Sequence, residues 1–160
     1  MDYISVEHQK ALAQRYRLAC IVVTAFMVSV LVYLLVARIV TPENPVPGSE
    51  TWAQPIYSGI IVLGLLVVVC RRLLLSQMVM RPAASRGGVI AVLANLFTMT
   101  IVVAVAAELA ALVGLVFYFL TGDYQYSWRL GVVSLFLLAY SFPRRGEWER
   151  AVVASTKAQA

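Results

Sequence analysis

The sequence predicts an all-α protein that crosses a membrane with four helices. Of its 160 residues, 61% are apolar and only 13% are charged, and the apolar residues gather in four separate blocks. A soluble domain of this length needs more charge to cover its surface. The blocks are continuously apolar, which indicates helices, because the strands of a membrane barrel alternate between apolar and polar residues.

The first two predicted spans cover residues 18–40 and 54–76. The apolar run 18–37 of the first span is interrupted only by Thr24 and Ser29 and is long enough to cross about 30 Å of hydrocarbon, and Arg38 follows at its outer end. The second has a shorter apolar centre, which reaches the required length when its flanking residues at both ends are included.

The other two predicted spans cover residues 89–120 and 127–142. The third has 32 residues and would reach about 48 Å at about 1.5 Å per residue. We therefore expect its first turns, which hold Asn95, at or beyond the cytoplasmic boundary. The fourth span is the shortest and ends before Pro143.

Lys and Arg residues predict the orientation of these helices. The N-terminal segment 1–17, the basic stretch 71–86 at the end of the second span and after it, and the C-terminal tail 143–160 hold 11 of the 13 basic residues, and the first connection holds none. The positive-inside rule therefore places both termini on the cytoplasmic side. In the tail, we expect Trp148, Val152 and Val153 to dip into the membrane interface. Aromatic anchors are expected at the outer boundary: Trp52, Tyr57, Tyr124, Tyr126 and Trp128.

Several function classes are excluded by what the sequence lacks. The net charge of +5 is explained by basic residues that flank membrane spans, so no nucleic acid partner is expected. The only histidine, His8, lies outside every span, and the spacing of Cys20 and Cys70 fits no metal or redox motif. No nucleotide-binding or nucleophile motif is present. We expect no enzyme activity, no cofactor and no metal site.

Glu108 is the main candidate for a functional residue. It lies in the unbroken apolar run 101–120, where a lipid-facing carboxylate costs about 2.5–3.5 kcal/mol. Small residues beside it let a neighbouring helix approach closely, and the resulting loss of hydration favours the protonated acid. The predicted helix-packing seam comprises Thr100, Ala104, Ala107, Ala111 and Gly114.

Residues 96–120, LFTMTIVVAVAAELAALVGLVFYFL, resemble the second helix of the proteolipid c subunit of rotary ATP synthases. The resemblance implies that Glu108 takes up and releases a proton or a sodium ion. It extends loosely to a hairpin of the second and third spans, joined by the basic connection 71–86. The departures are a second span with only Gly59 and Gly64 in place of a dense glycine pattern, and an extra helix on each side of the hairpin. No family match covers the whole chain. The matching positions are Ala104, Ala107, Glu108, Ala111, Gly114, Leu115 and Val116.

A faint internal repeat relates the second and fourth spans. Both begin with Tyr-Ser, at residues 57–58 and 126–127, and both end before Arg-Arg, at residues 71–72 and 144–145. Two duplicated hairpins explain this pattern, and so do the positive-inside constraints alone.

Two functions follow from the sequence. The first is a non-catalytic membrane subunit that packs in a larger complex of the bacterial inner membrane, with lipids and other subunits or copies of itself as partners. The alternative is proton or sodium handling through Glu108. A third hypothesis is lipid or quinone binding near Glu108, Tyr118 and Asn95.

Overall fold

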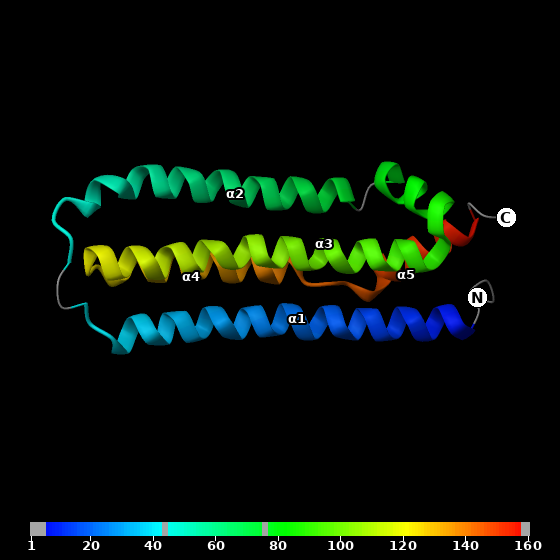
Figure 1. Cartoon of the computed structure of the whole chain (residues 1–160), viewed down its shortest axis with the longest axis horizontal. Coiled ribbons are helices and arrows are strands. Elements are labelled where there is room, and N and C mark those ends of the chain that lie inside the picture. The colour runs from blue at the N-terminus through cyan, green and yellow to red at the C-terminus, as the bar shows by residue number, and fades with distance from the viewer. Residues whose placement is uncertain (1–5, 43–44, 75–76, 158–160) are drawn as a thin grey trace. The chain divides into compact units, whose positions relative to one another are not determined.

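The structure is a computed structural model that describes residues 6–42, 45–74 and 77–157, without the side chains at positions 6, 8, 50, 70, 73–74, 77–87 and 157. In this part the regular secondary structure is entirely helical, which confirms the all-α part of the predicted fold class (Figure 1). The elements are α1 (Val6–Ile39), η1 (Ser49–Trp52), α2 (Ala53–Leu74), α3 (Gln77–Thr121), α4 (Tyr124–Ser141) and α5 (Arg145–Lys157).

Two helical segments within the described residues are long and apolar enough to cross a membrane. They are Gln9–Ile39 in α1 and Gly88–Thr121 in α3. Ala53–Val69 in α2 is a shorter apolar helix. The crossing of a membrane by four helices therefore remains a prediction.

The first helix begins at Val6, well before the span expected from residue 18. The residues that precede the apolar run are mostly strong helix formers such as Glu, Gln, Lys, Ala and Leu. The helix can therefore include the polar residues before position 18. Leu12 and Ala19, one on each side of that boundary, are both buried. Tertiary packing thus stabilises the helix in both its polar N-terminal part and its apolar part.

The long helix α3 also begins earlier than the span expected from residue 89, and it contains a break. Its helical course starts at Gln77, in the segment expected as a connection. At Gly88 the backbone has φ 64° and ψ −157°, a conformation that only glycine adopts readily. Gly88 therefore separates the first turns of α3 from the apolar part that follows.

The C-terminal tail forms the helix α5, and its apolar side chains are buried within the protein. Trp148 is 3% exposed and Val152 is fully buried, and both pack in one cluster with Leu12 of α1 and Leu93 of α3. The expectation that these side chains dip into the membrane interface is therefore wrong for Trp148 and Val152, whereas Val153 is half-buried. The spacing of four residues between Trp148 and Val152 places both on one face of a helix, which packs on this cluster.

The chain divides into two compact units, to both of which α1, α2 and α3 contribute. Unit 1 contains 11 of the 13 Lys and Arg residues and 4 of the 8 acidic residues, which gives a formal charge of +7. Unit 2 contains the other 2 basic residues and the other 4 acidic residues, which gives a formal charge of −2. Unit 1 comprises Met1–Val23, Val69–Val103 and Ser141–Ala160, and unit 2 comprises Thr24–Val68 and Ala104–Tyr140.

In unit 2, α3 and α4 form a tight antiparallel hairpin. The turn between them contains Gly122, whose φ of 77° favours glycine. The carbonyl oxygen of Leu120 accepts hydrogen bonds from the Val46 N–H at 2.8 Å and from the Ser49 hydroxyl at 3.3 Å. These bonds attach the segment between α1 and α2 to the end of α3.

Candidate functional site around Glu108

Glu108 is buried in unit 2 and has a hydrogen-bond partner from the same chain. Glu108 is only 9% exposed. The hydroxyl of Tyr33, on α1, donates a hydrogen bond of 2.9 Å to Glu108 Oε1. A buried carboxyl group requires such partners, because its hydration is lost on burial. The Tyr33 hydroxyl replaces part of that hydration.

The helix that covers Glu108 is therefore α1, and α4 packs against the same part of α1. Leu34, the neighbour of Tyr33, lies against Gly131 of α4. A Cβ atom at position 131 would come within 2.6 Å of Leu34 Cδ2, so glycine allows this close approach. Around Glu108, α1 contacts α3 through a hydrogen bond and α4 through a close apolar contact.

Four of the five predicted seam residues are buried in unit 2 with Glu108. Ala104 and Ala107 are fully buried, Ala111 is 2% exposed, and Gly114 is buried. A Cβ atom on Gly114 would lie 2.8 Å from Leu130 Cβ, so the backbones of α3 and α4 are nearly in contact there. The small residues of α3 thus serve its packing within the chain.

Thr100, the fifth predicted seam residue, lies in unit 1. Its hydroxyl donates a hydrogen bond of 2.8 Å to the backbone oxygen of Leu96, one turn earlier in the same helix. The Thr100 hydroxyl is therefore used within α3. The structure does not bring Thr100 into one unit with the other four seam residues.

Ser134 of α4 is a polar residue near this site that the sequence analysis did not identify. It is fully buried, and its Oγ makes no hydrogen bond with the part of the chain that the structure describes. Gly114 and Ala110 both pack against Leu130. Because α3 and α4 are antiparallel, this register places Ser134 at the level of residues 106–110 of α3, the stretch that contains Glu108.

Tyr33 was also missed, although the sequence contains a signal for it. It is the only tyrosine in the apolar run 18–37, and a hydroxyl group in such a run needs a partner. The second and fourth predicted spans also hold one tyrosine each, Tyr57 and Tyr140, so this signal gives candidate partners for Glu108 without selecting Tyr33. The sequence analysis named only Thr24 and Ser29 as polar residues of that run.

The residues of the proposed lipid or quinone groove are distributed over both units. Tyr118 is buried in unit 2, and its hydroxyl donates a hydrogen bond of 2.7 Å to the backbone oxygen of Val40. Asn95 lies in unit 1. The structure therefore does not gather Asn95 with Glu108 and Tyr118 in one unit.

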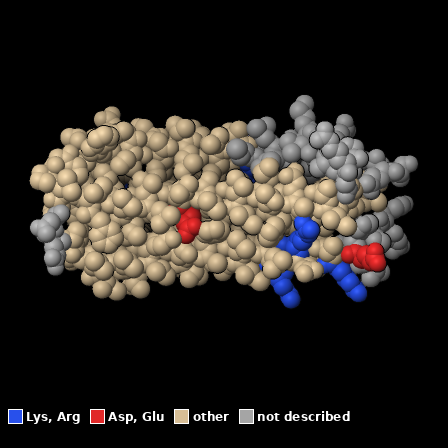
Figure 2. Space-filling model, viewed as in Figure 1, with Lys and Arg blue, Asp and Glu red and all other residues tan. Residues whose placement is uncertain are grey.

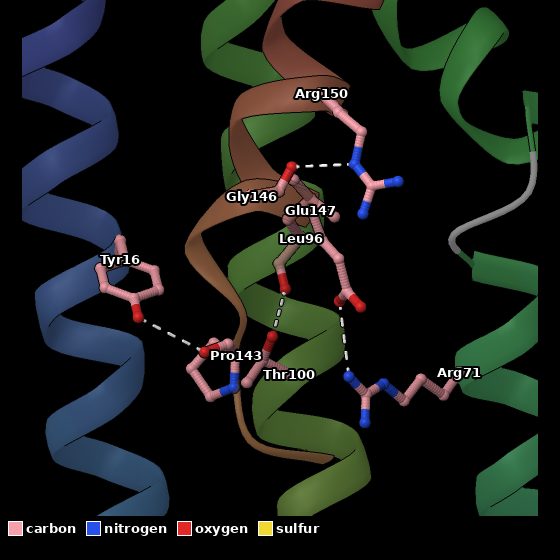
Figure 3. A network of polar contacts seen from close by, with 8 residues as sticks. All are labelled: Tyr16, Arg71, Leu96, Thr100, Pro143, Gly146, Glu147 and Arg150. Atoms are coloured by element: carbon pink, nitrogen blue, oxygen red, sulfur yellow. Dashed lines mark hydrogen bonds and ion pairs between the residues drawn. The ribbon is translucent and has the colours of Figure 1, made fainter. Parts of the chain in front are cut away.

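Unit 1 has a polar network of its own, which joins α2 and α1 to the C-terminal segment (Figure 3). Arg71 Nη2, near the end of α2, lies 3.4 Å from Glu147 Oε2 of α5, and these side chains are only 12% and 21% exposed. The hydroxyl of Tyr16 donates a hydrogen bond of 3.5 Å to the backbone oxygen of Pro143. These contacts hold α5 against the rest of unit 1.

Within the described residues, no group of three or more His, Cys, Asp or Glu side chains could hold a metal ion. Cys20 is a free, half-buried thiol. The side chains of His8 and Cys70, and those of Arg81 and Arg86 in the basic connection, lie outside the described part. Comparison with protein-family models, curated proteins and solved structures finds no match for this chain.

Proposed function

We propose that the chain is a four-helix protein of the bacterial inner membrane with both termini in the cytoplasm. The two long apolar helical segments and the shorter apolar helix in α2 support this proposal. Large apolar side chains with more than half of their surface exposed also support it, because they need lipid or another protein to cover them. Unit 1, which includes the N-terminal part of α1 and all of α5, has a formal charge of +7, and this charge supports a cytoplasmic location for both termini.

Within that membrane, the proposed function is that of a non-catalytic subunit that packs in or stabilises a larger complex. The observation that carries this proposal is the hydrogen bond from Tyr33 to Glu108. It gives the one acid of the apolar helix runs a partner from the same chain, in a region where α1, α3 and α4 already pack closely. A structural role accounts for Glu108 without an ion.

The surface that receives partners is the apolar face of α2. Ile61, Val62, Leu65 and Leu66 recur at helical spacing and are 55–65% exposed. In a membrane, such a face packs equally well against lipid tails or against an apolar helix of another subunit.

A second candidate function is proton or sodium handling at Glu108, in the manner of a proteolipid c subunit. The buried Ser134 hydroxyl, at the level of residues 106–110 of α3, favours it. Together with the Tyr33 hydroxyl and the carboxyl group, it would supply oxygen atoms of the kind that bind a cation or relay a proton. The resemblance of residues 96–120 to the proteolipid helix supports the same candidate.

Glu108→Gln distinguishes the two functions, and Glu7→Gln, an exposed acid in the first turn of α1, is the matched control. The subunit hypothesis predicts that the wild type and both variants co-migrate with a larger complex in mild detergent and support the same activity of that complex. Loss of proton or sodium flux from reconstituted protein with Glu108→Gln alone would establish ion handling. Carbodiimide labelling at acid pH that depends on Glu108 is expected for the proteolipid-like candidate, and its absence would exclude that candidate.

The membrane topology has a separate test. On a cysteine-free background, Thr51→Cys precedes α2 and Ala154→Cys lies on α5, and both positions are exposed. A membrane-impermeant maleimide added to intact cells is expected to label position 51 and not position 154. Labelling of position 154, or release of the protein from membranes by alkaline carbonate, would overturn the proposed topology.

A further inference from the structure

A groove of about 590 Å³ lies in unit 1 between the N-terminal part of α1 and the start of α5. Its lining combines basic and apolar side chains in one place, which the packing of helices does not require. The lining residues that matter here are Lys10, Leu12, Tyr16, Arg17, Cys20 and Arg145.

The basic side chains at this groove come from two helices and have no acidic counterpart in its lining. Lys10 and Arg17 lie on α1, seven residues apart and therefore on one face, and Arg145 is the first residue of α5. Arg145 Nε also donates to Glu149 at 2.8 Å, on an exposed part of α5. On the face that Figure 2 shows, Lys and Arg side chains lie close together, while much of the remaining described surface is uncharged.

The walls of the groove are held together by aromatic and polar contacts. The ring of Tyr16 meets the ring of Trp148 edge to face, with 6.0 Å between the ring centroids. The Tyr16 hydroxyl donates to the Pro143 carbonyl (Figure 3). The groove is therefore preformed, and the first residue of α5, Arg145, is part of its lining, so the positive end of the α5 dipole lies near the groove.

We propose that this groove binds one anionic phospholipid. The headgroup phosphate would lie among Lys10, Arg17 and Arg145, and an acyl chain would follow the apolar wall formed by Leu12 and Cys20. Charge complementarity selects an anionic headgroup, and the apolar wall selects a lipid over a free anion. The site goes beyond the proposed function, because it requires only that the protein contacts lipid and not that it packs in a complex.

Native mass spectrometry of the full chain in a neutral detergent tests the site, with equal amounts of phosphatidylglycerol and phosphatidylcholine. The wild type is expected to retain one phosphatidylglycerol preferentially. The double variant Arg17→Gln/Arg145→Gln is expected to bind it about thirtyfold more weakly, since each basic residue near an anionic headgroup contributes a factor of about five.

The matched control is Arg144→Gln/Arg150→Gln, which removes the same charge from the C-terminal segment at two exposed positions outside the lining. It is expected to change binding less than twofold. An equal loss in both double variants would overturn the site in favour of diffuse attraction, and equal retention of the two lipids would overturn the headgroup preference. Displacement by millimolar inorganic phosphate would identify a free-anion site instead of a lipid site.

Two further measurements keep these results interpretable. Tryptophan fluorescence on a Trp52→Phe/Trp128→Phe background reports whether Trp148 stays buried in each variant. If it does not, Lys10→Gln, at an exposed position, replaces the double variant. Its binding is expected to fall about fivefold, and unchanged binding would overturn the proposal. Carbonate extraction of the groove variants separates failure of this site, which leaves the protein in the membrane, from failure of membrane insertion itself.

Discussion

Tyr33→Phe removes one hydroxyl group and with it the hydrogen bond to Glu108 Oε1, while the ring and its packing remain. An intramolecular hydrogen bond contributes about 0.5–1.5 kcal/mol, and interhelical bonds in membrane proteins average about 0.6 kcal/mol with a maximum near 1.7. Glu108 is only 9% exposed, so little water can replace the lost donor. We therefore expect the upper part of this range, a loss of about 1–1.5 kcal/mol in the free energy of unfolding.

A double-mutant cycle isolates this bond from the other effects of each substitution. The purified protein in dodecyl maltoside is unfolded by titration with SDS and followed by tryptophan fluorescence, for the wild type, Tyr33→Phe, Glu108→Met and the double variant. A coupling of about 0.6–1.7 kcal/mol between the two positions is expected. Glu108→Gln keeps an oxygen acceptor and is expected to retain most of that coupling.

Tyr118→Phe is the control. It also removes one tyrosine hydroxyl group, but this hydroxyl donates to the backbone oxygen of Val40 and not to Glu108. It is expected to destabilise the protein independently of Glu108. A coupling below about 0.3 kcal/mol between Tyr33→Phe and Glu108→Met, the level found for independent sites, would refute the role of Tyr33 as the partner of Glu108.

Three further predictions concern packing and charge. Gly114→Ala places a Cβ atom 2.8 Å from Leu130 Cβ of α4, so SDS titration is expected to show a loss of about 1–3 kcal/mol in the free energy of unfolding. Gly59→Ala is the control: its Cβ atom meets nothing within 4 Å, and the substitution is expected to stabilise the protein by up to about 1 kcal/mol. Neutralising either partner of the Arg71–Glu147 ion pair is expected to cost about 1–3 kcal/mol in the same assay, and exchanging the two residues is expected to recover part of that loss. Gly88→Ala, at φ 64°, is expected to cost about 1–3 kcal/mol, and a melting temperature equal to that of the wild type would contradict the strain expected there.

The helical fold class could be predicted because long apolar runs have few alternatives. Once the apolar content fell into continuous blocks, helices were the only elements that fitted, and the structure has helices over all four blocks. The ends of the helices could not be read in the same way. Apolar content marks where a membrane could lie, whereas α1 continues through residues 6–17 because helix formers and packing sustain it.

The buried acid could be predicted and its partner could not. A lone glutamate in an apolar run needs cover, and the small residues beside it indicate where a helix packs. Which helix packs there depends on contacts between residues 75 positions apart, Tyr33 and Glu108, and no local pattern determines these. The same reason explains why the burial of Trp148 was missed, since its packing partner Leu12 lies near the other end of the chain.

The hydrogen bond between Tyr33 and Glu108 has a consequence for the biogenesis of the protein. Chains are synthesised from the N-terminus, so α1 is complete before the acid of α3 leaves the ribosome. At the proposed membrane location, α3 would enter a bilayer that already contains its hydroxyl donor. The Tyr33 hydroxyl would then already be in the membrane when Glu108 is inserted. A permuted gene that encodes α1 last would deliver Glu108 to the translocon before its hydroxyl donor has been synthesised.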